Sequence, residues 1–225
     1  MNIKKLEEYL VKNKIEEKIE WTSNITQTSR QVLGISAPKI KKIANIIFKD
    51  DYLFYLNKMP DKYYEEFLIS AYLISKIKDF DLQKKYLYKY AEKVTCWSEC
   101  DTLKLKIKNK EKEYLEISKD FIKSNKIYVR RIGIIILFNL INSEYLDEIF
   151  EIISNLKEEN EYYVNMAISW LLCECFIKKR LKTIEFLEKN KLNNFVIHKT
   201  ISKCRDSYRV SKSDKELLLK YKGEL

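Results

Sequence analysis

The apolar residues of this chain recur mainly at the spacing of an α-helix. Ser36 and Pro38 are typical of a helix start, and four apolar residues behind them share one helix face: Ile40, Ile43, Ala44 and Ile47. Asp61 precedes a second segment with one largely apolar face, formed by Tyr64, Phe67, Leu68, Ala71 and Ser75. Further helices are expected to begin near Leu82, Tyr114, Ile127, Glu144, Glu161, Leu181, Phe195 and Ser213. The pattern therefore predicts helices along the whole chain.

One segment can be interpreted in two ways. Residues Ile132–Ile141 form a largely β-branched run, which by composition alone could be a buried strand. The chain has only 3 Gly and 2 Pro, whereas hairpins need turn residues and Rossmann-type folds need glycines in their phosphate loops. The length of the run and its helical surroundings favour a buried helix. The predicted fold class is therefore all-α.

A weak internal repeat makes this prediction more specific. Tyr128-Val129 superposes on Tyr163-Val164 with an offset of 35 residues, and the apolar positions that follow correspond as well. A period of this size is typical of stacked helix pairs. We therefore predict HEAT-like helix-pair repeats that form a curved right-handed α-solenoid. Residues 1–225 are expected to form a single domain, and the protein is expected to be a monomer.

The charge of the chain is basic and clustered. There are 43 Lys and Arg against 33 Asp and Glu, which gives a formal net charge of +10. Thr22–Lys49 has five basic residues and no acidic one, and Lys104–Lys126 and Phe195–Leu225 each have eight basic residues against four acidic ones. Clustering favours nucleic acid as the partner, although a lysine-rich solvated surface is the alternative. The candidate phosphate contacts among the lysines are Lys39, Lys41, Lys42, Lys199 and Lys203.

The cysteines and the longest apolar runs exclude other classes of protein. The five cysteines are odd in number and lie among apolar neighbours, which indicates reduced, buried thiols. Their spacing does not suit a tetrahedral zinc site, so no metal is expected. No run approaches the roughly 18 apolar residues of a membrane span, and the N-terminal stretch has no signal-peptide core. We therefore expect a soluble, cytoplasmic protein with no membrane partner.

Three short motifs contain the residues of most chemical interest. Trp97 and Asp101 are four residues apart, so on a helical turn they share a face. The pair Arg130-Arg131 opens the most apolar helix of the chain, and Trp170 lies in a second apolar helix. Together with Leu33-Gly34-Ile35 near the N-terminus, these motifs resemble in kind and order those of the DNA alkylation repair family of HEAT-like DNA glycosylases.

The resemblance extends from about Leu33 to about Arg209 and implies a function. It implies a protein that holds duplex DNA and excises positively charged N3- and N7-alkylated purines without a metal or an organic cofactor. Where some members carry a further aromatic residue in the DNA groove, this chain reads Ile25-Thr26-Gln27, which thins the expected aromatic lining.

The resemblance also implies a role for each motif residue. Asp101 corresponds to the catalytic carboxylate, and Trp97 and Trp170 correspond to the two active-site indoles. Arg131 corresponds to the arginine that binds a phosphate, with Arg130 as an additional neighbour.

Elementary chemistry agrees with these roles. An alkylated purine with a fixed positive charge is already a good leaving group, so its excision does not need an acid that protonates the base. One carboxylate, Asp101, can stabilise the oxocarbenium-like transition state. Structural alternatives remain for three residues: Asp101 as a helix N-cap, Arg131 in a salt bridge, and Trp170 in the core. The alternative function is a non-catalytic HEAT-like scaffold that binds DNA or a protein partner.

Overall fold

The computed structural model describes residues 2–189 and 192–222. Throughout these residues the regular secondary structure is helical, and an isolated β-bridge joins Gln31 to Tyr63. The prediction of an all-α fold is therefore confirmed. The chain divides into two compact units, Met1–Lys106 and Ile107–Leu225. The single domain, the curvature and the monomeric state stay predictions.

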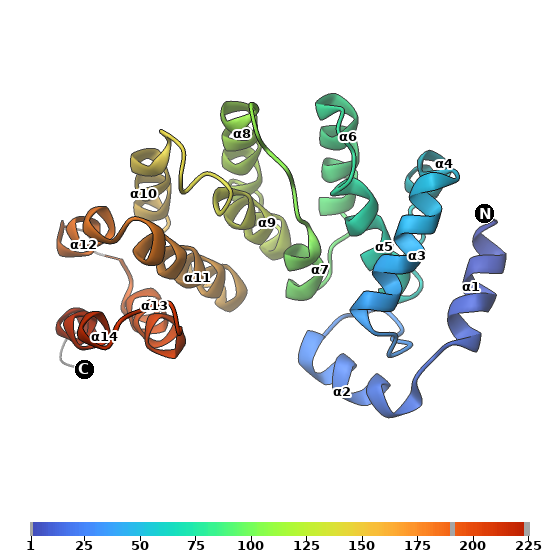
Figure 1. The fold of residues 1–225 in the computed structure, drawn as a ribbon, viewed down its shortest axis with the longest axis horizontal. Helices are drawn as coiled ribbons and strands as arrows, with labels where there is room; N and C mark the ends of the chain where they lie inside the picture. The colour runs from blue at the N-terminus through green and yellow to red at the C-terminus, as the bar shows by residue number, and fades with distance from the viewer. Residues whose placement is uncertain (1, 190–191, 223–225) are drawn as a thin grey trace. The chain divides into compact units, whose positions relative to one another are not determined.

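The first unit is organised around one buried helix (Figure 1). Its helices are α1 (Ile3–Lys12), α2 (Glu16–Thr26), α3 (Ala37–Lys49), α4 (Tyr52–Lys58), α5 (Tyr64–Ile74), α6 (Phe80–Ala91) and α7 (Trp97–Thr102). Helix α5 packs against α3, α4, α6 and α7, and ten of its eleven residues are buried. The position of α7 is therefore set mainly by α5.

Helix α3 confirms the first prediction made from the spacing of apolar residues. It begins after Ser36 with Pro38 in its first turn, and it buries the four apolar residues that were expected to share a face: Ile40, Ile43, Ala44 and Ile47. Burial of such a stripe against a neighbouring helix supplies most of the stability of a short helix. Here the neighbours are α4 and α5.

The second unit is a succession of packed helices (Figure 1). Its elements are α8 (Glu111–Ile122), α9 (Ile127–Leu137), α10 (Leu146–Asn155), α11 (Tyr162–Lys178), α12 (Arg180–Lys189), α13 (Asn194–Asp206), α14 (Lys212–Leu219) and a 3-10 turn (Lys220–Lys222). Helix α11 packs against both α9 and α13. The 35-residue offset in the sequence corresponds to the step from the start of α9 to the start of α11.

The ambiguous apolar run is helical in its first part, as predicted. Helix α9 continues to Leu137, and turns follow it. Gly133 allows α9 to approach α8 closely, because a Cβ at this position would lie 2.9 Å from the carbonyl oxygen of Ser118. The Ser118 hydroxyl also donates a hydrogen bond to the carbonyl of Gly133 at 2.8 Å. A larger residue would force these two helices apart.

The cysteines also agree with the prediction, since all five are free and buried. Within residues 2–189 and 192–222, every helix is too short or too polar to cross a lipid bilayer. The same residues contain no group of three or more His, Cys, Asp or Glu side chains placed to hold a metal ion.

Candidate functional site

Helix α7 is a single six-residue helix that presents Trp97 and Asp101 together. Its other face is in the core, where Glu99 and Cys100 are fully buried, whereas Trp97 and Asp101 are only partly buried. Cys96 occupies the N-cap position, and Asp101 lies near the C-terminal end of the helix. The structure therefore excludes the N-cap role for Asp101 in α7. The predicted sharing of one helix face by the indole and the carboxylate is consistent with this geometry.

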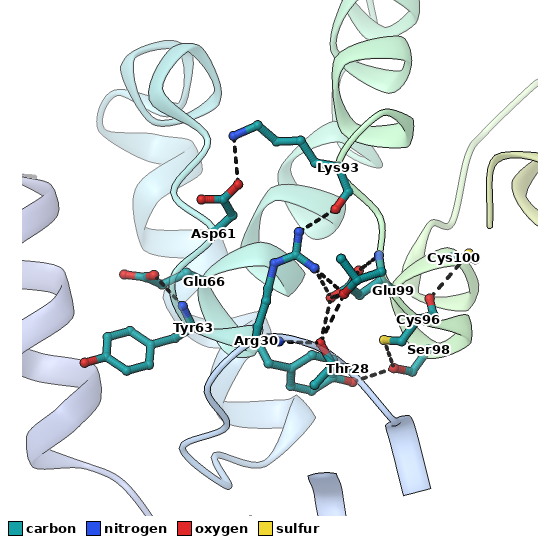
Figure 2. Close-up of polar contacts among 12 residues, drawn as sticks. Thr28, Arg30, Asp61, Tyr63, Glu66, Lys93, Cys96, Ser98, Glu99 and Cys100 are labelled. Carbon is teal, nitrogen blue, oxygen red and sulfur yellow. Dashed lines mark hydrogen bonds and ion pairs between the residues drawn. The ribbon is translucent and has the colours of Figure 1, made fainter. Parts of the chain in front are cut away.

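The buried face of α7 is held by the Glu99 carboxylate (Figure 2). Glu99 Oε1 pairs with Arg30 Nη1 at 2.7 Å, and Glu99 Oε2 accepts the backbone N–H of Thr95 at 2.7 Å. The Tyr90 hydroxyl donates to the Glu99 carbonyl at 3.0 Å. Burial raises the pKa of Glu99, although Arg30 and the Thr95 N–H favour its charged form. Three contacts from three segments thus fix the orientation of this short helix.

Arg30 connects the loop between α2 and α3 to this network. Its guanidinium lies over the Phe67 ring, 3.9 Å from the centroid, and Phe67 stacks in turn on Tyr90 with 4.3 Å between ring centroids. Nη1 also donates to the Thr95 hydroxyl at 2.6 Å. In Figure 2 the side chain extends from its loop toward the Lys93 carbonyl and Glu99. Sequence reasoning counted Arg30 only as one basic residue of a cluster and missed this buried role.

The Leu33-Gly34-Ile35 element holds the start of α2. Glu65 on α5 accepts the backbone N–H groups of Leu33 and Ile35 at 3.1 and 3.2 Å. Burial raises the pKa of the Glu65 carboxyl, and these N–H groups oppose the rise. Gly34 has φ +73°, and a Cβ there would lie 2.4 Å from the carbonyl oxygen of Ile15. Only glycine fits both the backbone conformation and the close approach.

The end of α2 contacts α7 directly. The Trp97 indole Nε1 donates a hydrogen bond to the carbonyl oxygen of Ile25 at 3.1 Å. This bond fixes the position of the indole ring. It also commits the indole N–H to the protein, so the ring face remains the group with which Trp97 can meet a ligand.

In the second unit, the two adjacent arginines of α9 have different environments. Arg131 is buried, and its Nη1 donates to the carbonyl of Tyr163 on α11 at 2.5 Å. Arg130 forms a two-point ion pair with Glu159 through Nε and Nη2, at 2.8 and 3.3 Å, and its Nη1 donates to the carbonyl of Ser124. Arg130 thus makes a salt bridge, the kind of contact considered for Arg131 as a structural alternative. DNA contacts by either arginine stay predictions.

Trp170 lies at the boundary between the core and the surface of α11. Its neighbours Ile168 and Leu171 are buried, whereas Trp170 itself is partly exposed. The indole packs edge-on against Phe138, with 4.6 Å between ring centroids and 62° between the planes. Its environment is therefore compatible with both the core role and the ligand-facing role.

The predicted lysines differ in how far they are available. Lys39 Nζ donates to the Asn13 side chain at 2.7 Å and is partly buried, whereas Lys41 and Lys42 on the same helix are exposed. Lys199 and Lys203 lie one turn apart on α13, and both are partly buried. The Lys199 ammonium lies 5.6 Å from the centroid of the Phe195 ring.

Comparison with known proteins identifies the family. The family model described as DNA alkylation repair enzyme matches residues 6–203. The chain belongs to this family. Family membership supports a role in DNA repair, and it confirms the resemblance noted from the sequence motifs.

The fold of this DNA alkylation repair family member agrees with that of a solved relative. The chain is similar to a predicted DNA alkylation repair enzyme from Enterococcus faecalis, with a TM-score of 0.66 and 12% sequence identity. The similarity covers 86% of this chain and 98% of the relative. A comparison with curated protein sequences finds no significant match.

Proposed function

We propose that this protein is a DNA glycosylase that excises positively charged N3- and N7-alkylated purines from duplex DNA. The main supporting observation is that α7 presents Trp97 and Asp101 on the face opposite its buried Glu99 contacts. Membership in the DNA alkylation repair family supports alkylated DNA as the substrate. A buried ion pair that orients one short helix is typical of the support that a catalytic group needs.

Asp101 is the proposed catalytic group. Cleavage of the N-glycosidic bond develops positive charge on the deoxyribose, and the alkylated base departs with its electrons and becomes neutral. A carboxylate about 4 Å from that charge, at an effective dielectric constant of about 20, interacts by about 4 kcal/mol, or about a thousandfold in rate if the interaction acts only in the transition state. Water then adds to the sugar carbon and loses one proton to the solvent, which leaves a neutral hydroxyl on the sugar. No metal and no organic cofactor takes part in this mechanism.

The two indoles are proposed to act through their ring faces. A cation above an indole face is stabilised by about 0.5 to 2 kcal/mol, depending on how far it is desolvated. The Trp97 N–H is already bonded to Ile25, which leaves its ring for this purpose. We propose that Trp170 of the second unit likewise presents its indole to the DNA. Replacing Trp170 with Ala should then reduce excision more than affinity for undamaged duplex.

Phosphate contacts are proposed to hold the DNA. The net charge of +10 supplies the long-range attraction. The side chains of Lys41 and Lys42 are exposed and can therefore reach a phosphate. Arg131 is buried in this structure, and it is the proposed principal contact because it corresponds by resemblance to the phosphate-binding arginine of the family. Arg130 can contribute only if its ion pair with Glu159 opens, because that pair uses Nε and Nη2 of its guanidinium.

The experiment measures release of 7-methylguanine and 3-methyladenine from methylated duplex DNA by the wild type and by Asp101→Asn. The Asn side chain keeps the shape but removes the charge, so excision should fall by about two to four orders of magnitude while affinity for undamaged duplex holds or improves. Asp147→Asn is the matched control, because Asp147 is exposed on α10 and pairs only at the surface with Lys182.

Two results would contradict the proposal. Full excision by Asp101→Asn would remove Asp101 from the mechanism. DNA binding by the wild type without release of either base would favour the non-catalytic scaffold.

A further inference from the structure

Helix α2 places its largest apolar side chains in solvent. Among its eleven residues only Thr26 is buried. Trp21 is 65% exposed and Ile25 is 44% exposed. Trp21 is the most exposed of the large apolar side chains described in the first unit. Because tryptophan is usually well buried, an indole left in water on an ordered helix points to a ligand.

The exposed side chains of α2 lie on a rigid segment. At its start, the Ile15 N–H donates to the carbonyl of Leu33 at 2.8 Å, and Gly34 packs against the first turn. At its end, the Ile25 carbonyl accepts the Trp97 indole N–H. Trp21 lies one turn before Ile25 on the same helix face. Trp21 therefore lies one helical turn from the residue whose carbonyl holds the Trp97 indole.

We propose that Trp21 packs its indole face against a nucleotide adjacent to the one that Trp97 and Asp101 act on. This inference rests on the proposed function. The contact would be with a deoxyribose or with a base face that the lesion site leaves unstacked, because neighbouring bases cover the other base faces of a duplex. Such an unstacked base face and an indole face stack without regard to sequence.

The charges on α2 weigh against contact with a phosphate. Glu16, Glu17 and Glu20 are exposed on this helix, against one lysine, Lys18. An acidic helix repels phosphates. The indole is thus the group on α2 that can attract DNA, and it would do so through apolar contact and stacking.

The experiment uses Trp21→Ala and Trp21→Phe and measures dissociation constants for undamaged duplex and for duplex with a tetrahydrofuran abasic-site analogue. Loss of one stacking contact should weaken binding of the analogue duplex by about 5- to 100-fold in Trp21→Ala, while Trp21→Phe should stay within about threefold of wild type. Phe54→Ala is the matched control, because Phe54 is 42% exposed on α4 of the same unit. It should bind like wild type.

A second measurement reports the Trp21 environment directly. Duplex DNA should protect wild-type tryptophan fluorescence from iodide quenching, and this protection should be smaller in Trp21→Phe, which retains only the contribution of Trp97 and Trp170. Because Trp21 is largely exposed, neither variant should change the melting temperature much. Either unchanged affinity in Trp21→Ala or iodide quenching of the wild type that DNA does not diminish would overturn the inference.

The outcomes separate this inference from the proposed function. If the wild type excises methylated purines while Trp21→Ala binds DNA normally, the glycosylase function stands and the role of Trp21 falls. If Trp21→Ala weakens binding and DNA shields Trp21 but no base is released, the DNA contact stands and the glycosylase function falls. If the wild type binds neither duplex, both are wrong.

Discussion

Arg30 Nη1 lies 2.7 Å from Glu99 Oε1, and both side chains are almost fully buried, with 6% and 0% of their surface exposed. The two residues are 69 positions apart, so this ion pair joins the loop after α2 to α7. A buried pair costs desolvation free energy in forming, but loss of one partner leaves an uncompensated charge in the core. The pair therefore acts as a geometric constraint on the turn that carries Trp97 and Asp101.

The first prediction concerns this ion pair. Arg30→Ala should lower the free energy of unfolding by about 3–5 kcal/mol in urea denaturation, because Glu99 would keep a buried charge without its partner. The double variant Arg30→Met/Glu99→Leu should recover most of that loss, since it removes both charges. Lys189→Ala, which breaks an exposed pair with Glu185, should cost less than about 1 kcal/mol. If Arg30→Ala lowered the free energy of unfolding no more than Lys189→Ala does, the buried ion pair would not act as this constraint.

The second prediction concerns Glu66 and pH. Burial raises the pKa of Glu66 from 4.5 to about 7, although the Tyr63 N–H opposes this rise through a 3.0 Å hydrogen bond. The folded protein therefore holds the Glu66 proton more tightly than the unfolded chain. The stability that this provides is present below about pH 4.5 and is lost as the pH rises through about 7.

Glu66→Gln replaces the carboxyl with an amide that stays neutral at every pH tested. The free energy of unfolding of this variant relative to the wild type should therefore rise between pH 5 and pH 8. Urea denaturation of both proteins at the two pH values measures the change. Glu158→Gln is the control, because Glu158 is exposed and should change the comparison little. A constant difference between Glu66→Gln and the wild type across this range would show that Glu66 does not titrate as expected.

Local patterns predicted the elements well, because they depend on residues close in sequence. The apolar face of α3 and the spacing of Trp97 and Asp101 follow from the helical period alone. The offset between Tyr128 and Tyr163 likewise indicated the step from α9 to α11.

Contacts between distant segments could not be predicted in the same way. Nothing in the sequence near Arg30 indicates that its partner is Glu99, because that pairing depends on how α5 and α7 pack. The two adjacent arginines show the same limit. The helical period places Arg130 and Arg131 on different faces of α9. Only the position of Glu159 in the folded chain shows that Arg130 pairs with it.

The third prediction concerns Gly34. Alanine at this position would have an unfavourable φ of +73°, which costs about 1–2 kcal/mol, and its Cβ would also clash with the Ile15 carbonyl oxygen. Gly34→Ala should therefore lower stability by more than the φ cost and should speed hydrogen exchange of the amides in α2. Gly34→Asn separates the two effects, because Asn tolerates this φ but retains the Cβ. If Gly34→Asn were as stable as the wild type, a Cβ at position 34 would not clash with the Ile15 carbonyl oxygen as expected.

The fourth prediction concerns Arg131 and salt. If phosphates dominate the binding of duplex DNA, the logarithm of the affinity should fall linearly with the logarithm of salt concentration, with little dependence on sequence. Arg131→Ala should reduce the magnitude of this slope by about 0.9 if the side chain contacts one phosphate, whereas Arg131→Lys should keep the slope because it keeps the charge. Lys182→Ala serves as the control, since Lys182 is exposed and paired with Asp147.

The structure gives Arg131 a second role, because its guanidinium joins α9 to the Tyr163 carbonyl on α11. Arg131→Ala should therefore also lower the melting temperature. A lower melting temperature with an unchanged salt slope would assign Arg131 to the packing of these two helices and would leave the phosphate contact to other basic residues.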